Sequence, residues 1–111
     1  MTAARACSRA DLPEVGAIRV VVDGWTVAIV NTVEGIFAIE DRCSHADVAL
    51  SEGDVDGYTI ECWLHGSQFD LRTGEPLSLP ANKPVPVFPV TVAGQGTSAD
   101  ILVDILETRQ E

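Results

Sequence analysis

Two short segments hold nearly all of the side chains in this chain that bind soft metals. The first is Cys43-x-His45, and the second, after a spacer of sixteen residues, is Cys62-x-x-His65. The chain has two histidines and three cysteines, so both histidines and two of the cysteines lie in these segments. Each segment offers one thiolate and one imidazole. The spacing therefore predicts a fold in which two short loops converge on one metal site.

Two kinds of metal site use two cysteines and two histidines. One is a structural zinc, and the other is a Rieske [2Fe–2S] cluster, in which two histidines replace two cysteines on one iron. Zinc fingers usually take a cysteine pair from one element and a histidine pair from another. Here each segment is mixed, and glycines punctuate the spacer between the segments. The pattern favours the iron–sulfur cluster over zinc.

The resemblance to a known family extends beyond the four ligands. The chain continues as His65-Gly66-Ser67-x-Phe69-Asp70, then Arg72-Thr73-Gly74, and then Leu79-Pro80-Ala81. Together with the two ligand segments, these motifs resemble the small Rieske-type ferredoxins of bacterial ring-hydroxylating oxygenase systems. The resemblance covers about residues 3–106, which is nearly the whole chain.

This resemblance implies a role for each site residue. It implies that one [2Fe–2S] cluster is bound by four ligands, with the thiolates on one iron and the imidazoles on the other: Cys43, His45, Cys62 and His65. It also implies four neighbours of the cluster. Ser67 would donate a hydrogen bond to a bridging sulfide, and Pro80 would lie in a third loop, residues 77–81, that covers the cluster. Leu64 and Phe69 stand where high-potential relatives carry a disulfide cysteine and a tyrosine.

The ligand set predicts an electron carrier of low potential within its class. The formal charges of two ferric ions, two sulfides and two thiolates cancel, so adding one electron is easier than in an all-cysteine cluster. The residues at the two disulfide positions are Val48 and Leu64, so the disulfide of high-potential relatives cannot form. Between residues 40 and 75 there are nine acids and only two bases, Arg42 and Arg72. The missing disulfide and the excess of acids both lower the expected reduction potential, whereas the hydrogen bond from Ser67 would raise it.

The rest of the chain predicts an all-β protein. Many short β-branched segments alternate with turns, and no segment has a sustained helical period. We expect an antiparallel sandwich or barrel of the Rieske fold, forming one domain over residues 1–111, with a cluster-binding sub-domain at about 42–81. The expected strands are residues 4–8, 17–22, 25–31, 36–39, 58–61, 87–92 and 101–106, and residues 68–71 lead away from the second ligand segment. Residues 51–57 are expected to form a loop, and a helical turn is allowed only at 46–50. Asp23-Gly24 is expected to form a hairpin turn, and Gly66 and Gly74 are expected to adopt positive φ.

Charge and hydropathy exclude several classes of partner. The net charge of −10 disfavours nucleic acid, whose phosphates would be repelled, and favours basic protein surfaces. No apolar run is long enough to span a membrane, and the first residues lack the apolar core of a signal peptide. We therefore expect a cytoplasmic protein, and we expect a monomer.

The function that follows is transfer of single electrons. The resemblance implies a carrier between an NAD(P)H-dependent flavin reductase and the terminal oxygenase of an aromatic-ring dioxygenase. An oxygenase itself needs a second iron held by further histidines, and none remain, so the chain is not expected to be an enzyme. Two alternatives stay open: a general or accessory carrier in iron–sulfur assembly or nitrite reduction, and a zinc-stabilised binding module.

Two other residues have open interpretations. Cys7 is expected to be a small buried hydrophobic residue rather than a ligand. Trp63, between two ligands, either packs beneath its loop or belongs to a docking face. The docking face is expected at the end of the molecule that carries the two histidines, at Ala46, Leu64, Gly66 and Pro80.

Overall fold

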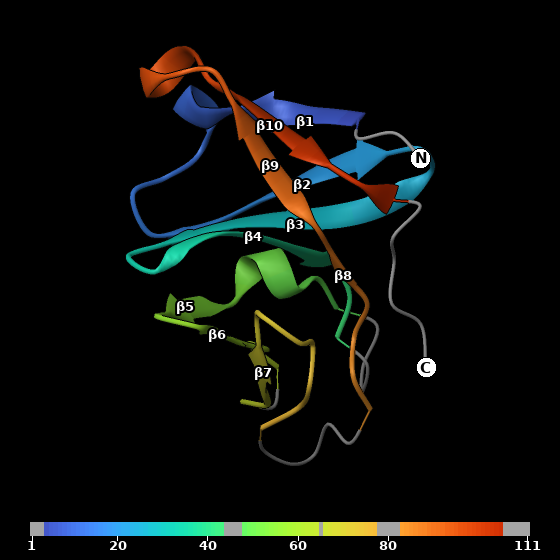
Figure 1. Cartoon of the computed structure of the whole chain (residues 1–111). Helices are drawn as coiled ribbons and strands as arrows, with labels where there is room; N and C mark the ends of the chain where they lie inside the picture. Colours follow the sequence, from blue (N-terminus) through green and yellow to red (C-terminus); the bar gives the residue numbers. More distant parts are fainter. Residues whose placement is uncertain (1–3, 44–47, 65, 78–82, 106–111) are drawn as a thin grey trace.

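Three antiparallel sheets make up the described part of the chain, which comprises residues 4–43, 48–64, 66–77 and 83–105 of a computed structural model (Figure 1). The largest sheet has the order β2-β3-β4-β8, with β2 at Gly16–Val22, β3 at Trp25–Thr32, β4 at Gly35–Glu40 and β8 at Val87–Phe88. The second has the order β1-β10-β9, with β1 at Ala4–Ser8, β10 at Asp100–Val103 and β9 at Val90–Ala93. The third has the order β5-β6-β7, with β5 at Asp54–Asp56, β6 at Thr59–Glu61 and β7 at Gln68–Asp70. The all-β prediction is confirmed.

The β2–β3 hairpin shows how local sequence builds the largest sheet. Val22 pairs with Trp25 across a two-residue turn, in which Asp23 has φ 50° and Gly24 has φ 82°. Positive φ at both central residues is the requirement of a type I′ turn, which Asp-Gly favours. The hairpin predicted at these two residues is therefore confirmed.

Strand β3 has a core on each of its two faces. Because side chains alternate along a strand, Val27 and Ile29 point to one face of the sheet and Ala28 and Val30 to the other. The first pair packs in a core shared with β1 and β10, and the second in a core shared with β6 and β7. All four residues are fully buried. The sheet is thus the middle layer, with the small β1-β10-β9 sheet on one side and β5–β7 on the other (Figure 1).

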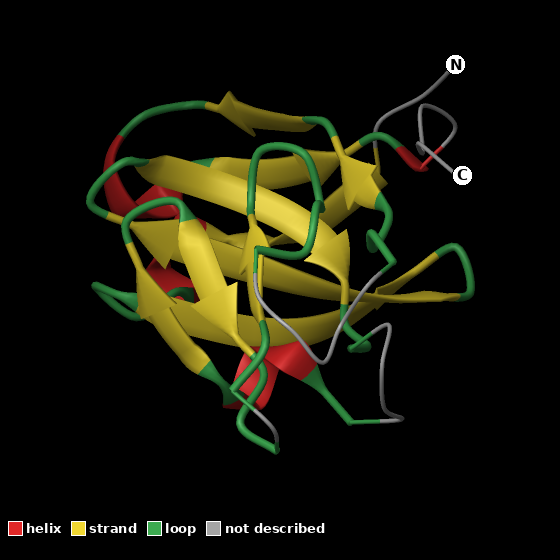
Figure 2. Ribbon diagram, turned by 90° about the horizontal axis from the view of Figure 1, so that it is seen from below, coloured by secondary structure: helices red, strands yellow, loops and turns green. Residues whose placement is uncertain are grey.

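The β5–β7 sheet is an insertion between neighbouring strands of the largest sheet. The chain leaves β4 at Glu40, forms β5, β6 and β7, and returns at β8, where Val87 pairs with Ile39. Seen from below, the short strands of this insertion lie across the strands of the large sheet (Figure 2). We call β5–β7 and the loops between β4 and β8 the sub-domain; its boundaries at about 42–81 stay a prediction.

Two strand predictions are wrong in detail. Residues 51–57, expected as a loop, contain β5, in which Val55 pairs with Ile60 between two exposed aspartates. Aspartate is rare in strands, so propensity conceals this element. Residues 87–92, expected as one strand, form β8 and β9 instead. Pro89 separates them, because proline has no N–H to donate to a ladder.

Helical structure is limited to three short 3₁₀ turns within the described residues: η1 at Arg9–Asp11, η2 at Leu50–Glu52 and η3 at Gly96–Ser98. Of the helical turn allowed at 46–50, only residue 50 belongs to a turn, η2. Residues 48 and 49 are not helical, and residues 46 and 47 lie outside the described residues. In the part of the chain that is described, no helix has the length and apolar character needed to cross a bilayer.

Candidate metal centre

The two predicted cysteine ligands lie buried in one core. Cys43 follows β4 and is 2 % exposed, and Cys62 follows β6 and is 1 % exposed. Both belong to the apolar cluster beneath the large sheet, together with Leu50, Ile60 and Phe69. None of the three cysteines, all of which are described, forms a disulfide, and the third, Cys7, lies in the opposite core as expected. The fold therefore brings together two thiols that are far apart in sequence.

Each cysteine stands at the base of a loop closed by backbone hydrogen bonds. The Cys43 N–H donates to the carbonyl of Val48 at 3.0 Å. The Cys62 N–H donates to the carbonyl of Ser67 at 2.7 Å, and the Gly66 N–H donates to the carbonyl of Cys62 at 2.9 Å. Gly66 has φ 76°, the left-handed conformation that glycine adopts without strain. These bonds fix the backbone that presents each thiol.

The two predicted imidazole ligands lie outside the described residues. His45 falls in the gap at 44–47, within the loop closed by Cys43, and His65 falls within the loop closed by Cys62. Among the residues that are described, no three Cys, His, Asp or Glu side chains gather at one point. The assignment of all four ligands stays a prediction.

The predicted neighbours of the cluster fall into two groups. Ser67 and Phe69 are fully buried, next to Cys62 in the chain, and Phe69 belongs to the same core as both cysteines. Leu64 is 42 % exposed, at the tip of the Cys62 loop. Pro80 lies outside the described residues. The buried pair is placed to influence a group held by Cys62, whereas Leu64 forms part of the surface.

The donor set fits a cluster held between two loops. A Rieske centre needs two thiolates and two imidazoles, and the thiols of Cys43 and Cys62 are in no disulfide, are buried and belong to one core. A zinc ion would accept the same four donors. The two cysteines therefore agree with both metal sites, and relatives are needed to decide between them.

Large apolar side chains are exposed in the Cys62 loop and on the segment that follows β7. Trp63 is 52 % exposed and Leu77 is 52 % exposed. The Leu77 N–H donates to the carbonyl of Gln68 at 2.6 Å, which ties this segment to β7. Of the two interpretations of Trp63, exposure favours a docking face over a packing role. We call Trp63, Leu64 and Leu77 the apolar rim.

A brace that sequence analysis missed links the sub-domain to the large sheet. The guanidinium of Arg72 donates to both carboxylate oxygens of Asp70, at 3.1 and 3.0 Å, and lies 4.1 Å from the ring centre of Tyr58. The Tyr58 ring meets Phe37 of β4 edge to face, with centroids 5.9 Å apart. The hydrogen bond from Arg72 lowers the pKa of Asp70, and the same hydrogen bond raises the pKa of Arg72.

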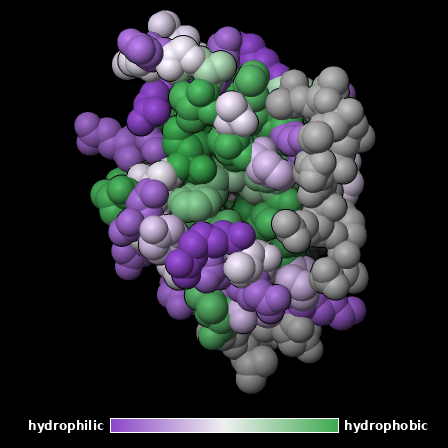
Figure 3. Space-filling model, in the orientation of Figure 1, coloured by the Kyte–Doolittle hydropathy of each residue, from purple (hydrophilic) through white to green (hydrophobic). Residues whose placement is uncertain are grey.

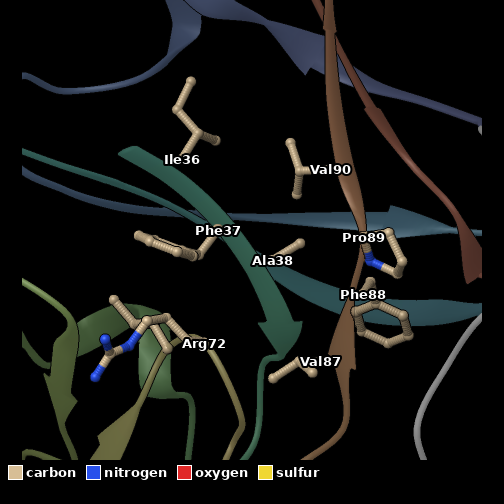
Figure 4. A pocket seen from close by; sticks show the side chains of 9 residues that line it. Ile36, Phe37, Ala38, Arg72, Val87, Phe88, Pro89 and Val90 are labelled. Carbon is tan, nitrogen blue, oxygen red and sulfur yellow. The ribbon is translucent and has the colours of Figure 1, made fainter. Parts of the chain in front are cut away.

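The brace borders an open apolar hollow of about 300 Å³ at the junction of β4, β8 and β9. Phe37 and Arg72 lie on one side of this hollow, and Phe88 and Pro89 lie on the other (Figure 4). The same face of the molecule carries a group of apolar side chains at its centre (Figure 3). No motif in the sequence predicted either the brace or the hollow, since Asp70-x-Arg72 does not reveal the distant Tyr58 and Phe37.

Two glycines allow backbones to approach closely around the site. A Cβ added to Gly53 would overlap the carbonyl oxygen of Glu61, the residue before Cys62. A Cβ added to Gly74 would overlap the carbonyl oxygen of Val85. The backbone of any other residue would also be strained there, because Gly74 has φ 80°. The positive φ predicted for Gly74 is thus confirmed, but the role of Gly53 was missed.

Comparison with known proteins identifies relatives along nearly the whole chain. Residues 2–89 match the family model of the Rieske [2Fe-2S] domain. The 3-phenylpropionate/cinnamic acid dioxygenase ferredoxin subunit of Escherichia coli (strain K12) is 41 % identical over 105 residues, which cover 94 % of each chain.

Two solved structures extend the comparison to the fold. The ferredoxin of carbazole 1,9a-dioxygenase from Nocardioides aromaticivorans IC177 is 36 % identical, with a TM-score of 0.82, over 93 % of this chain and 97 % of that one. A chain in the complex of reduced oxygenase and oxidized ferredoxin in carbazole 1,9a-dioxygenase is 33 % identical, with a TM-score of 0.78, over 91 % of each chain.

Proposed function

Because the chain belongs to the Rieske [2Fe-2S] domain family, whose members carry a [2Fe–2S] cluster, we propose that Cys43, His45, Cys62 and His65 bind one such cluster. The observation that carries this proposal is the burial of both thiols in one core, each at the base of a closed loop. The family match also favours the cluster over the zinc-stabilised binding module. When bound, the cluster supplies one-electron chemistry.

We further propose that the protein carries single electrons to the terminal oxygenase of an aromatic-ring dioxygenase. Relatives at 41 and 36 % identity are ferredoxins of such dioxygenases, and this chain spans 94 % and 97 % of their lengths. The flavin reductase is the donor in this proposal. The chain acts as a carrier and not as an enzyme, because its two histidines are both used as ligands.

In this proposal the buried residues hold the cluster, and the exposed residues of the apolar rim meet the partner proteins. Cys43 and Cys62 hold the cluster from the apolar core, where little water reaches it. His45 and His65 belong to the two loops that continue from these cysteines, and the apolar rim is exposed beside the second loop. We propose that partners dock on this end, which sequence analysis placed at Ala46, Leu64, Gly66 and Pro80. A small apolar patch with acids around it suits a brief encounter.

Other features of the proposal follow from charge and sequence. The net charge of −10 favours basic patches on the reductase and the oxygenase, and it disfavours nucleic acid. We propose a monomer that works in the cytoplasm and has no membrane partner. The second candidate, a general or accessory carrier, keeps the same cluster and differs only in its partners.

Metal analysis of matched variants tests the ligand assignment. The purified protein should be red-brown, with two irons and two acid-labile sulfides per chain. Cys62→Ala and His45→Ala should lose the cluster, because each removes one of four ligands. Cys7→Ala is the control, since Cys7 is equally buried but lies in the opposite core. One zinc per chain without sulfide would contradict the assignment.

An ionic-strength series tests the docking end. Electron transfer from a flavin reductase to this protein, and from it to an oxygenase, should slow as salt rises, because salt screens the acidic surface. Charge reversal at Asp47 or Glu75 should weaken this salt dependence. Glu14→Lys is the control, because Glu14 is exposed but lies outside the sub-domain. Rates that respond equally to Glu14→Lys and Glu75→Lys would contradict docking at this end.

A further inference from the structure

Among the described acids between residues 40 and 75, one differs from the others in its burial. Asp41 is 4 % exposed, and its side chain is fully buried. It is the one charged residue that is buried among the described residues. Exposed acids such as Asp54 and Asp56 are surrounded by water, which screens their charge. A buried carboxylate acts at longer range on its surroundings.

Hydrogen bonds hold the Asp41 carboxylate in one position. The backbone N–H of Ser51 donates to Oδ1 at 2.6 Å, and the Ser51 hydroxyl donates to Oδ2 at 2.7 Å. The Asp41 N–H donates to the carbonyl of Thr26 on β3 at 2.9 Å. The carboxylate thus joins the end of β4 to η2 across the base of the loop that contains Cys43.

The compensating positive charge lies on the solvent side. Nε of Arg19 is 3.7 Å from Oδ2 of Asp41, and the Arg19 side chain is 58 % exposed. Arg19, Glu40 and Arg42 line the same hollow of about 280 Å³ as Asp41. Arg19 and Arg42 are exposed, so solvent screens their positive charges and the negative charge of Asp41 is only partly offset.

We propose that Asp41 is a positioning residue that anchors the first ligand loop and, through its buried charge, lowers the reduction potential of the cluster, while Arg19 partly offsets that charge. This inference rests on the proposed ligation by Cys43. Asp41 is two residues before Cys43, so their Cα atoms are within about 7 Å of each other. Reduction adds one negative charge to the cluster, and a fixed negative charge nearby opposes it.

Coulomb's law gives the size of the effect. Two unit charges about 10 Å apart, at an effective dielectric constant of about 20, change an equilibrium about tenfold. Removal of the Asp41 charge should therefore favour reduction about tenfold. Removal of the Arg19 charge should disfavour reduction, by about twofold, because the exposed guanidinium is more strongly screened.

Three substitutions in the holoprotein test this inference by redox titration. Asp41→Asn removes the charge and keeps one oxygen that can accept from the Ser51 N–H. Its amide NH2 replaces the oxygen that accepted from the Ser51 hydroxyl, and this hydroxyl can turn to accept from the new donor. Arg19→Gln removes the opposite charge at an exposed side chain. Asp54→Asn is the control, because it makes the same charge change at an exposed residue of the sub-domain. We expect midpoint shifts of opposite sign for Asp41→Asn and Arg19→Gln, and almost no shift for Asp54→Asn.

The outcomes separate this inference from the proposed function. An Asp41→Asn shift no larger than that of Asp54→Asn would overturn it, and so would shifts of the same sign for Asp41→Asn and Arg19→Gln. The Asp41→Asn shift should also persist from about 0.05 to 0.5 M salt, because buried charges are screened less than exposed ones. If Asp41→Asn does not fold, the sign of the Arg19→Gln shift decides. A wild-type protein without the cluster would overturn the proposed function as well.

Discussion

Substitution of Gly53 tests how the fold holds the second ligand loop. Gly53 has φ −89°, which any residue can adopt. Glycine is therefore required at this position only because β6 approaches too closely to leave room for a Cβ. A Cβ there would overlap the carbonyl oxygen of Glu61 and lie 2.9 Å from its carbonyl carbon. Ordinary contacts between such atoms are about 3.5 Å or longer, so β6 must move by more than ~0.5 Å. Glu61 precedes Cys62, and this movement would displace the ligand.

The expected cost of Gly53→Ala is about 3 kcal/mol, the upper part of the range for overpacking. For a chain of this size, that lowers the thermal midpoint by about 10 °C. The assay is thermal bleaching of the visible cluster absorbance, with unfolding followed by circular dichroism in parallel.

Gly57→Ala is the matched control for this substitution. Gly57 lies in the neighbouring turn, has φ 61°, and has no atom within 4 Å of an added Cβ. Its substitution should cost only about 1 kcal/mol, from the left-handed backbone. If Gly53→Ala and Gly57→Ala bleach at the same temperature, the close approach to Glu61 has no energetic weight and the reasoning is wrong.

Two further predictions concern the potential and the brace. The midpoint potential should lie near the bottom of the Rieske range, roughly −150 mV, and Ser67→Ala should lower it while Phe69→Tyr raises it; a wild-type midpoint well above zero would contradict this. Arg72 lowers the pKa of Asp70 in the folded state. The ion pair therefore stabilises the fold at pH values above the ordinary carboxyl pKa of about 3.9. This stabilisation is lost as the pH falls through the lowered pKa of Asp70 in the folded protein. Denaturant unfolding should therefore show wild type more stable than Asp70→Asn by up to ~1 kcal/mol at pH 7, with the difference decreasing as the pH falls through the lowered pKa of Asp70. A difference that does not change with pH would exclude the pair as its source.

Much of the fold could be predicted because its signals are local. The Asp23-Gly24 turn and the apolar run of β3 depend on residues that are neighbours in the chain. Strand β5 could not be predicted in this way. Its stability comes from pairing with β6, and aspartates occupy both of its exposed positions, so local propensity opposes the observed structure.

The candidate site likewise has features that local sequence predicts and features that depend on tertiary contacts. Sequence by itself determined the family and predicted the four ligands, because the chemistry of two cysteines and two histidines depends on their identity and spacing. Only the tertiary structure decided which acid is buried and which glycine permits a close approach. The burial of Asp41 and the contact of Gly53 with Glu61 both depend on segments separated by about ten residues or fewer, yet neither has a local signature. Burial and packing are properties of the assembled sheets, since water is excluded only when separate strands meet.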